Sequence, residues 1–482
     1  RKPPPPPPPP PRSVVPSVGA LLRFTAPCLG ALLTSEIMSL VDTSVVGRTS
    51  TLQLAALAPA INIADTSAYI FYFLNVATMS LVASSLARGR TPQAYRVVSN
   101  ALSIAFLLGS VTGVCVICFS ANLLRTILGS VASQEIVTAS QSYLHVRILG
   151  LPFALCTAVA QASLQASKDP YSPLIAVAAG GLLNLVLDMY LAVHLGMGIR
   201  GAAWATLAAQ MAQCGSLLFL VERKRRAVLP PGPSQALFAW PEAKLLRSFL
   251  AFAGPIFFVR MGKTLCYSSM TAAASAAGVT ALAGHQVMNA LFLMSAKVGD
   301  SISQTIQAHV PQTLDMRARV TERTRKLTRR MNGIATVASL GTGLGAFCLA
   351  RYLGYWFTPN PEVVDATAGA SPFLFLALSV HSITLCGEGV LLALHDLGFI
   401  VQGYAATIVI FLVALHTGKA MGMGLNGTWG MLVLLQVLRV VQFQGRCVWL
   451  KAVRAPWQSE PKSRAALRAA ALAAKAGRYH PL

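Results

Sequence analysis

Hydrophobic residues occur in long runs along almost the whole chain, separated by short polar or basic connections. Most runs reach the roughly 20 apolar residues that an α-helix needs to cross a bilayer. The short alternating segments of a transmembrane β-barrel do not occur. The pattern therefore predicts an all-α polytopic membrane protein with 12 transmembrane helices. We place these helices at 18–46, 53–86, 97–120, 141–166, 172–195, 200–221, 246–273, 279–310, 331–352, 370–394, 398–418 and 424–445.

Composition and charge agree with a membrane protein. Of the 482 residues, 54% are hydrophobic and only 11% are charged, against about 25% charged in soluble domains. Most of the 39 Lys and Arg residues lie in the two tails and the even-numbered connections. The odd-numbered connections carry only Arg48, Arg125, Arg200, Arg351 and Lys419. This asymmetry predicts both termini on the cytoplasm-like side. Basic loops facing anionic headgroups account for the net charge of +23, so the expected partner is the lipid bilayer and not nucleic acid.

The chain also repeats itself once. ASLQASKD at 162–169 matches GVLLALHD at 389–396, and the basic connection 88–96 returns at 317–325. The repeat predicts two pseudo-symmetric six-helix lobes. Parallel repeats of this kind usually place a substrate site between the two halves. The predicted parts are a Pro-rich disordered tail (1–17), an N-lobe (18–221), a basic, Pro-rich linker (222–245), a C-lobe (246–445) and a basic C-terminal tail (446–482).

Carboxylate and amide side chains interrupt the apolar runs of the first half. Asn184 and Asp188 are four residues apart and share one helical face, while Asp42 ends the first run. A carboxylate within hydrocarbon costs roughly 2.5–3.5 kcal/mol and is usually functional. Gln161 and Thr206 add polar groups on neighbouring helices. Two alternatives stay open: Asp42 reaches water at a helix end, and the amides and hydroxyls only bridge helices.

The second half carries a different polar pattern. Arg260, Lys263 and Tyr267 lie on the seventh run, and Glu388 lies on the tenth. On the eighth run, with Lys297 beside it, one face within a 100° arc collects His285, Asn289, Asp300, Ser303, Gln304 and Gln307. These groups form either structural ion pairs, such as Lys263 with Glu388, or a cationic cavity wall that attracts an organic anion.

Several motifs resemble the multidrug and toxic compound extrusion (MATE) transporters. They are VDTSVVGR at 41–48, KDPYSPL at 168–174, and NLVLD at 184–188 followed by GMGIRGAAWATLAAQ at 196–210. Within that family the chain resembles the plant and algal plastid-envelope branch, which includes a salicylate exporter linked to enhanced disease susceptibility. The segments that carry this second resemblance are 54–87, GHQVM at 284–288, SQTIQAHVP at 303–311, Lys263 and Glu388.

The resemblance implies cation-coupled efflux by alternating access between two bundles of six helices. In the family, an N-lobe cluster binds H⁺ or Na⁺, and the matching positions here are Asp42, Gln161, Asn184, Asp188 and Thr206. Other branches place a coupling acid in the seventh helix. This chain has Arg260 and Lys263 there, which departs from that pattern.

The sequence thus predicts a secondary active antiporter that exports a small organic compound in exchange for H⁺ or Na⁺. We expect an organic anion, such as an aromatic or carboxylic acid, as the substrate. The alternatives are an organic-cation or multidrug efflux antiporter and a lipid-linked-precursor flippase of the same superfamily. An enzyme is not expected, because neither a nucleophile–base pair nor a nucleotide motif is found. We predict substrate contacts from Lys263, Arg260, Tyr267, His285, Asn289, Lys297, Asp300, Gln304 and Glu388.

Cofactors and other partners are expected to be few. The nine cysteines do not form a zinc or disulfide framework, so we predict no cofactor and no metal site. The exception is the coupling ion, since Na⁺ could be held at Asp42 and Asp188. We expect a monomer that takes a small-molecule substrate. The resemblance places it in the plastid (chloroplast) envelope, with an N-terminal targeting segment expected to be missing from this sequence.

Overall fold

A computed structural model describes residues 15–47, 51–128, 134–228, 236–240, 242–315, 320–356 and 360–453. These residues are almost entirely helical. In chain order, the longer elements are α1 (Val18–Gly47), α2 (Thr51–Ile70), α3 (Tyr72–Ala87), α4 (Thr91–Leu128), α5 (Gln134–Ile148), α6 (Leu151–Ala166), α7 (Tyr171–Leu187), a π-helix η2 (Asp188–His194), α8 (Gly198–Val228), α9 (Ala243–Ala276), α10 (Val279–His309), α11 (Glu322–Tyr352), α12 (Pro361–Ala393), α13 (Leu397–Ala420) and α14 (Leu425–Val453).

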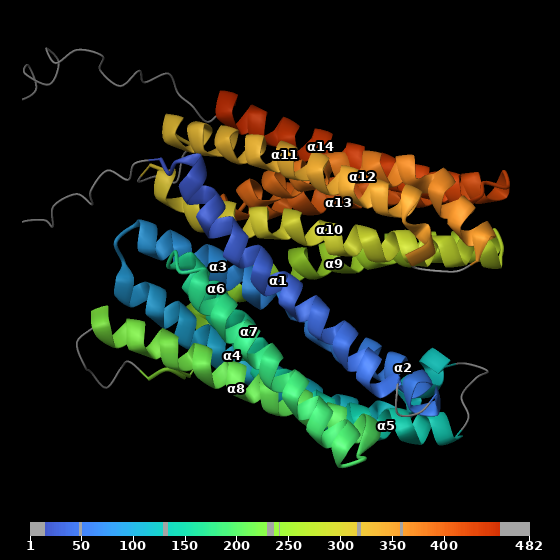
Figure 1. Cartoon of the computed structure of the whole chain (residues 1–482). Helices are drawn as coiled ribbons and strands as arrows, with labels where there is room; N and C mark the ends of the chain where they lie inside the picture. Colours follow the sequence, from blue (N-terminus) through green and yellow to red (C-terminus); the bar gives the residue numbers. More distant parts are fainter. Residues whose placement is uncertain are drawn as a thin grey trace, which may run out of the picture.

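The helices form two lobes, which confirms the predicted architecture (Figure 1). Helices α1–α8 make one lobe and α9–α14 make the other. The lobes converge at the end of the molecule where α1 begins and α14 ends, and they diverge toward the opposite end. At the converging end the Thr25 and Thr305 hydroxyls lie 2.9 Å apart, and the Phe24 ring packs edge-on against His309. Arg330 of α11 donates to the carbonyl oxygens of Val15 and Pro16 there.

The membrane spans agree with the sequence in kind, though not in exact number. Nine described helices are long and apolar enough to cross a bilayer, or ten if α5 and α6 count as one span bent by 44°. Pro152 in the first turn of α6 accounts for a helix restart at that bend, because proline lacks the backbone N–H that a continuous helix would use. The predicted second helix is also divided, into α2 and α3 at Phe71. The described helices are thus consistent with the twelve predicted.

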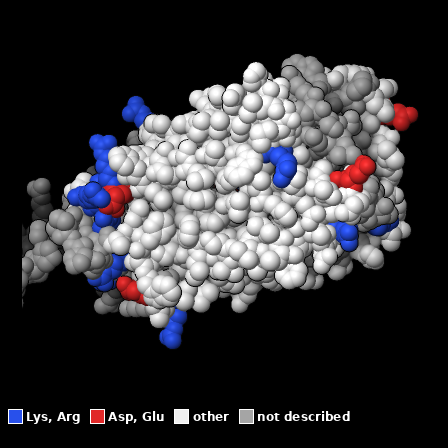
Figure 2. Space-filling model, turned by 90° about the horizontal axis from the view of Figure 1, so that it is seen from below, with Lys and Arg blue, Asp and Glu red and all other residues white. Residues whose placement is uncertain are grey.

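The surface matches a protein that sits in a bilayer. Figure 2 shows a broad, almost uncharged middle with most Lys and Arg gathered at one end. Large apolar side chains such as Val114, Phe119, Leu182 and Val186 are exposed along α4 and α7. Helix α1 begins and α14 ends at the same end of the molecule, which is also the end that carries most Lys and Arg (Figure 1, Figure 2). We call it the Arg-rich end. Helix α8 continues to Val228, into the segment predicted as a linker. Residues 1–14 and 454–482, which hold most of both predicted tails, lie outside the described residues.

The internal repeat appears as two turns with the same backbone path. Lys168 and His395 both have positive φ, 62° and 59°. The next residue of each turn, Asp169 or Asp396, donates its N–H to the carbonyl oxygen five residues earlier. Both carboxylates then pair with the last helix of their lobe, Asp169 with Lys224 and Asp396 with Arg446. Each pairing fixes one loop against its own lobe.

The Asp169 carboxyl titrates below its usual range. Burial raises its pKa, but hydrogen bonds from Lys224 and Ser172 outweigh that effect and hold the pKa below its ordinary value. The carboxylate therefore stabilises the fold in its ionised form.

Candidate functional site

The N-lobe site is built where α7 changes into the π-helix η2. Asn184 is in the last turn of α7 and Asp188 is the first residue of η2. The Asn184 side chain donates to Asp188 Oδ2 at 2.7 Å, and Asp188 is fully buried. The predicted i, i+4 pairing on one face is therefore present. Short π-helical segments within helices are frequent at functional sites.

A cavity of about 370 Å³ lies beside this pair in the N-lobe. Asn184 and Thr206 line it, and the Thr206 hydroxyl donates to the Ala202 carbonyl, which leaves its oxygen free to accept. Gln161 is half-buried on α6 and does not line the cavity. Residue 42 belongs to α1, but its side chain lies outside what the structure describes. Asn184 thus contacts Asp188 and shares the cavity wall with Thr206, whereas the cation-binding role of these residues and of Asp42 stays a prediction.

Other charged residues on the cavity wall were not predicted as site residues. Glu36 and Asp65 line the cavity together with Arg147, whose Nη2 lies 3.9 Å from Asp65 Oδ1. Glu36 also forms an ion pair with Lys297 of α10, with 2.6 Å between Nζ and Oε1. The structure therefore places Lys297 in a contact between the lobes and not on the C-lobe cavity. Both carboxylates interrupt apolar runs in the sequence, and that signal could have identified them.

The C-lobe site is a smaller cavity of about 40 Å³ at the boundary between the lobes. It brings together five of the predicted residues, and Tyr72 and Asn75 of the N-lobe complete one wall. The Arg260 guanidinium lies 3.7 Å from the centre of the Tyr72 ring, a cation–π contact across the lobes. The predicted residues that line this cavity are Arg260, Lys263, Asp300, Gln304 and Glu388.

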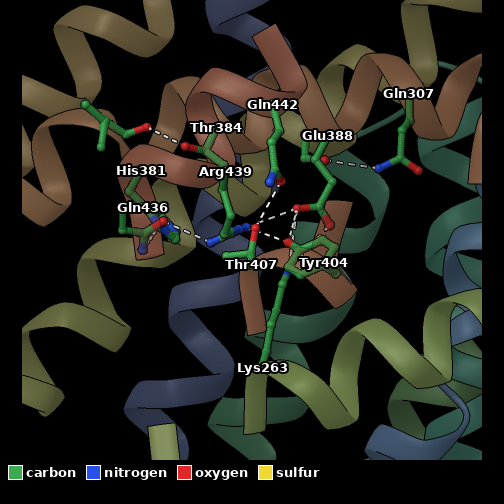
Figure 3. Close-up of polar contacts among 12 residues, drawn as sticks. Lys263, Gln307, His381, Thr384, Glu388, Tyr404, Thr407, Gln436, Arg439 and Gln442 are labelled. Carbon is green, nitrogen blue, oxygen red and sulfur yellow. Dashed lines mark hydrogen bonds and ion pairs between the residues drawn. The ribbon is translucent and has the colours of Figure 1, made fainter. Parts of the chain in front are cut away.

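Glu388 is the centre of a buried polar network (Figure 3). Its Oε2 accepts from the Tyr404 hydroxyl at 2.7 Å and from Arg439 Nη2 at 3.2 Å. Lys263 Nζ stands further off, at 3.4 and 3.5 Å from the two carboxylate oxygens. Arg439 also donates to Gln436, whose amide contacts His381 Nδ1 at 2.9 Å. Arg439 and Tyr404 were missed, although Arg439 stands in an apolar run just as Asp188 does.

Besides Lys297, three predicted contact residues lie outside the C-lobe cavity. His285 is buried, with Nε2 3.1 Å from the Thr271 hydroxyl and its ring against Trp429. Tyr267 packs against Phe292 instead of facing the cavity, and Asn289 does not line it. The polar face of α10 is therefore divided: its second half, from Asp300 to Gln307, reaches the cavity and its first half does not.

The two cavities offer charged and polar binding groups. Among the described residues, no group of three or more His, Cys, Asp or Glu side chains is placed to hold a metal ion. The N-lobe cavity offers oxygen ligands and carboxylates, which suit a proton or a hard cation. The C-lobe cavity offers Arg260 and Lys263, which suit a carboxylate.

Comparison with known proteins gives a consistent result. The MatE family model matches residues 27–190. Protein DETOXIFICATION 47, chloroplastic, of Arabidopsis thaliana is 31% identical over 434 residues, which cover 88% of this chain and 77% of that protein. Protein DETOXIFICATION 44, chloroplastic, of the same plant is 25% identical over 88% of this chain and 82% of its own length. A transporter of the MOP superfamily from Pyrococcus furiosus has the same fold, with a TM-score of 0.80 at 17% identity over 91% of this chain and 97% of that chain.

Proposed function

The chain belongs to the multidrug and toxic compound extrusion (MATE) family of membrane transporters, and we propose that it is a secondary antiporter that exports a small organic anion in exchange for H⁺ or Na⁺. The lobes would alternate between two arrangements, of which the present one is closed at the Arg-rich end. The likeness to a salicylate exporter stays a prediction. Placement in the plastid envelope is likewise proposed, on the strength of the chloroplastic relatives.

The observation that carries the anion proposal is the charge on the C-lobe cavity. Lys263 and Arg260 line it, whereas the nearest carboxylate, Glu388, is already bound by Arg439 and Tyr404. Lys263 is therefore only partly neutralised. A lysine in a poorly hydrated cavity gains from a second anion, and a substrate carboxylate would supply it.

The cavity volume limits when that substrate can bind. About 40 Å³ is far below the roughly 300–1,000 Å³ of small-molecule pockets, so an aromatic acid does not fit the present arrangement. Because Tyr72 and Asn75 of the N-lobe form one wall, separation of the lobes would enlarge the cavity. We therefore propose that the anion binds at Lys263 in a different lobe arrangement, as alternating access requires.

The coupling cation would bind in the N-lobe. Asp188 is buried and hydrogen-bonded to Asn184, and Thr206 lines the adjoining cavity. Asp42 joins this set by family resemblance. Two carboxylates that share one poorly hydrated site titrate as a pair, so their protonation could favour one lobe arrangement over the other. A difference of a few kcal/mol between those arrangements suffices for transport.

One observation favours a second candidate, efflux of an organic cation. The N-lobe cavity, at about 370 Å³, is within the size range of small-molecule pockets. Its wall combines Glu36 and Asp65 with the rings of Tyr69 and Tyr143. Carboxylates beside aromatic rings suit an organic cation. The polarity of the substrate is thus the point that an experiment must decide.

The deciding experiment measures uptake of phthalate by the purified chain in liposomes. Phthalate is an aromatic dicarboxylate that stays ionised near pH 7 and so does not cross the bilayer unaided. In Lys263→Gln we expect the KM for phthalate to rise about 10- to 100-fold, because a charge-assisted contact worth roughly 1.5–3 kcal/mol is lost. Lys263→Arg should retain most of the affinity. Lys419→Gln is the matched control, because Lys419 is exposed at the end of α13.

Two results would reject the anion proposal. One is an unchanged phthalate KM in folded Lys263→Gln. The other is competition by tetraethylammonium, an organic cation, that is stronger than competition by unlabelled phthalate. Either result would support the cation alternative.

A further inference from the structure

Arg439 is a buried cation to which the proposed transport function assigns no role. It lies within the apolar part of α14, and only 1% of its surface is exposed. It does not line the C-lobe cavity, which Lys263 does. A guanidinium buried this deeply stays charged only where its contacts offset the cost of desolvation, and the contacts of Arg439 do so. Arg439 Nη2 donates to Glu388 Oε2 at 3.2 Å and to the Tyr404 hydroxyl at 2.6 Å, and Nη1 donates to Gln436.

These contacts divide the Glu388 carboxylate unequally between two cations. Oε2 is used by Arg439 and by Tyr404, which itself donates at 2.7 Å. Lys263 Nζ lies at 3.4 and 3.5 Å, beyond the usual hydrogen-bond range of about 2.7–3.2 Å. A guanidinium stays charged at any physiological pH, so Arg439 neutralises Glu388 permanently.

The charges around the cavity then do not cancel. Among the described residues, the cations are Arg260, Lys263 and Arg439, and the carboxylates are Asp300 and Glu388. Three positive charges against two negative charges leave the site with one net positive charge when all five are ionised. Without Arg439 these charges would sum to zero, and the Glu388 carboxylate would pair with Lys263.

We propose that Arg439 determines the anion specificity of this site, although it would not touch the substrate. It is a positioning residue: it binds the Glu388 carboxylate without itself lining the cavity, and so leaves Lys263 available to a substrate carboxylate. This inference rests on the proposed anion transport and names the residue that sets its polarity. Without Arg439, the site would carry no net charge and would discriminate poorly between anions and cations.

The test uses phthalate transport by the full-length chain in liposomes, with KM and kcat determined separately. Arg439→Gln should raise the KM about 10- to 100-fold, the effect of removing one unit charge several ångströms from a poorly hydrated site. Arg439→Lys keeps the positive charge but loses the two-pronged contact with Gln436 and Glu388, so its KM should lie between those of the wild type and Arg439→Gln. Arg439→Gln combined with Glu388→Gln removes both charges, restores the net positive charge and should lower the KM at least tenfold below that of Arg439→Gln.

The double variant separates this role from a structural one. A purely structural arginine would give a double variant no better than Arg439→Gln, and that result would overturn the inference. An unchanged KM in folded Arg439→Gln would overturn it too. If Arg439→Gln fails to fold, the double variant is compared with Glu388→Gln alone: a higher KM in the double variant supports the inference, and equal values reject it.

Failure of this inference is distinguishable from failure of the proposed function. If Lys263→Gln loses affinity and Arg439→Gln does not, the site binds anions but Arg439 does not set its polarity. If neither variant changes the phthalate KM, the anion site itself lies elsewhere.

Discussion

The contact between Thr25 and Thr305 gives a direct way to lock the lobes in the described arrangement. Their hydroxyl oxygens are 2.9 Å apart, and both side chains are buried at the Arg-rich end, at 7% and 0% exposure. β-carbons that present touching hydroxyls lie near the separation of about 3.5–4.5 Å that a disulfide needs. We therefore expect Thr25→Cys with Thr305→Cys to form a disulfide on oxidation.

Cross-linking should stop transport in proportion to its yield. The two lobe arrangements need differ by only a few kcal/mol, but the covalent bond removes the arrangement that opens at this end. If 90% of molecules are cross-linked, about 10% of the transport rate should remain, and a reductant should restore it. Yield is measured by counting free thiols in denatured protein with a maleimide-linked polymer. The nine native cysteines all lie among the described residues and no disulfide joins them, so wild type and Thr25→Cys alone serve as oxidation controls.

The prediction has a clear contrary result. Fully cross-linked protein that transports as fast as the reduced form would show that the lobes need not separate at this end. Absence of cross-linking under conditions that oxidise exposed thiol pairs would show that α1 and α10 do not meet there.

Three further outcomes follow from single sites. Asp188→Asn should abolish gradient-driven transport while leaving folded protein, because an amide can neither exchange a proton nor neutralise Na⁺. Asp365→Asn, at an exposed position, should transport normally. Gly389→Ala should lower the free energy of unfolding by about 1–3 kcal/mol, because its β-carbon would lie 2.9 Å from Ser303 Oγ and 3.0 Å from Ser303 O. Gly345→Ala is the control, because its β-carbon would meet no atom within 4 Å. Because the pKa of Asp169 is lowered in the folded protein, its ionised carboxylate stabilises the fold at pH values above the ordinary pKa, and this stabilisation is lost as the pH falls. The melting temperature of Asp169→Asn should therefore decline less steeply than that of the wild type below about pH 4.

Much of the fold could be predicted because it depends on one-dimensional patterns. Apolar runs long enough to span a bilayer predicted the helices, and the repeat predicted two lobes. The two matching turns at Asp169 and Asp396 are the repeat in three dimensions. The bend before α6 was not predicted, although Pro152 is a local signal for it. The division at Phe71 has no comparable signal in the sequence.

The site was harder to predict, because it depends on how helices are rotated against one another. The i, i+4 spacing placed Asn184 next to Asp188 correctly, since both lie on one helix. Spacing along α10 could not show that His285 would be covered by Trp429 or that Lys297 would reach Glu36 in the other lobe. Those contacts are set by lobe packing. Charge within an apolar run is the signal that would also have identified Arg439.

Cation-coupled anion export is tested most directly by concentrative uptake of phthalate into liposomes that contain the purified chain. An outward H⁺ or Na⁺ gradient is imposed, and the membrane potential is held constant with potassium and valinomycin. We expect phthalate to accumulate above its external concentration under one of the two gradients, and an ionophore for that ion to abolish the accumulation. Tetraethylammonium should not accumulate. Accumulation of tetraethylammonium without phthalate, or mere equilibration of phthalate under both gradients, would show that the chain is not a cation-coupled exporter of organic anions.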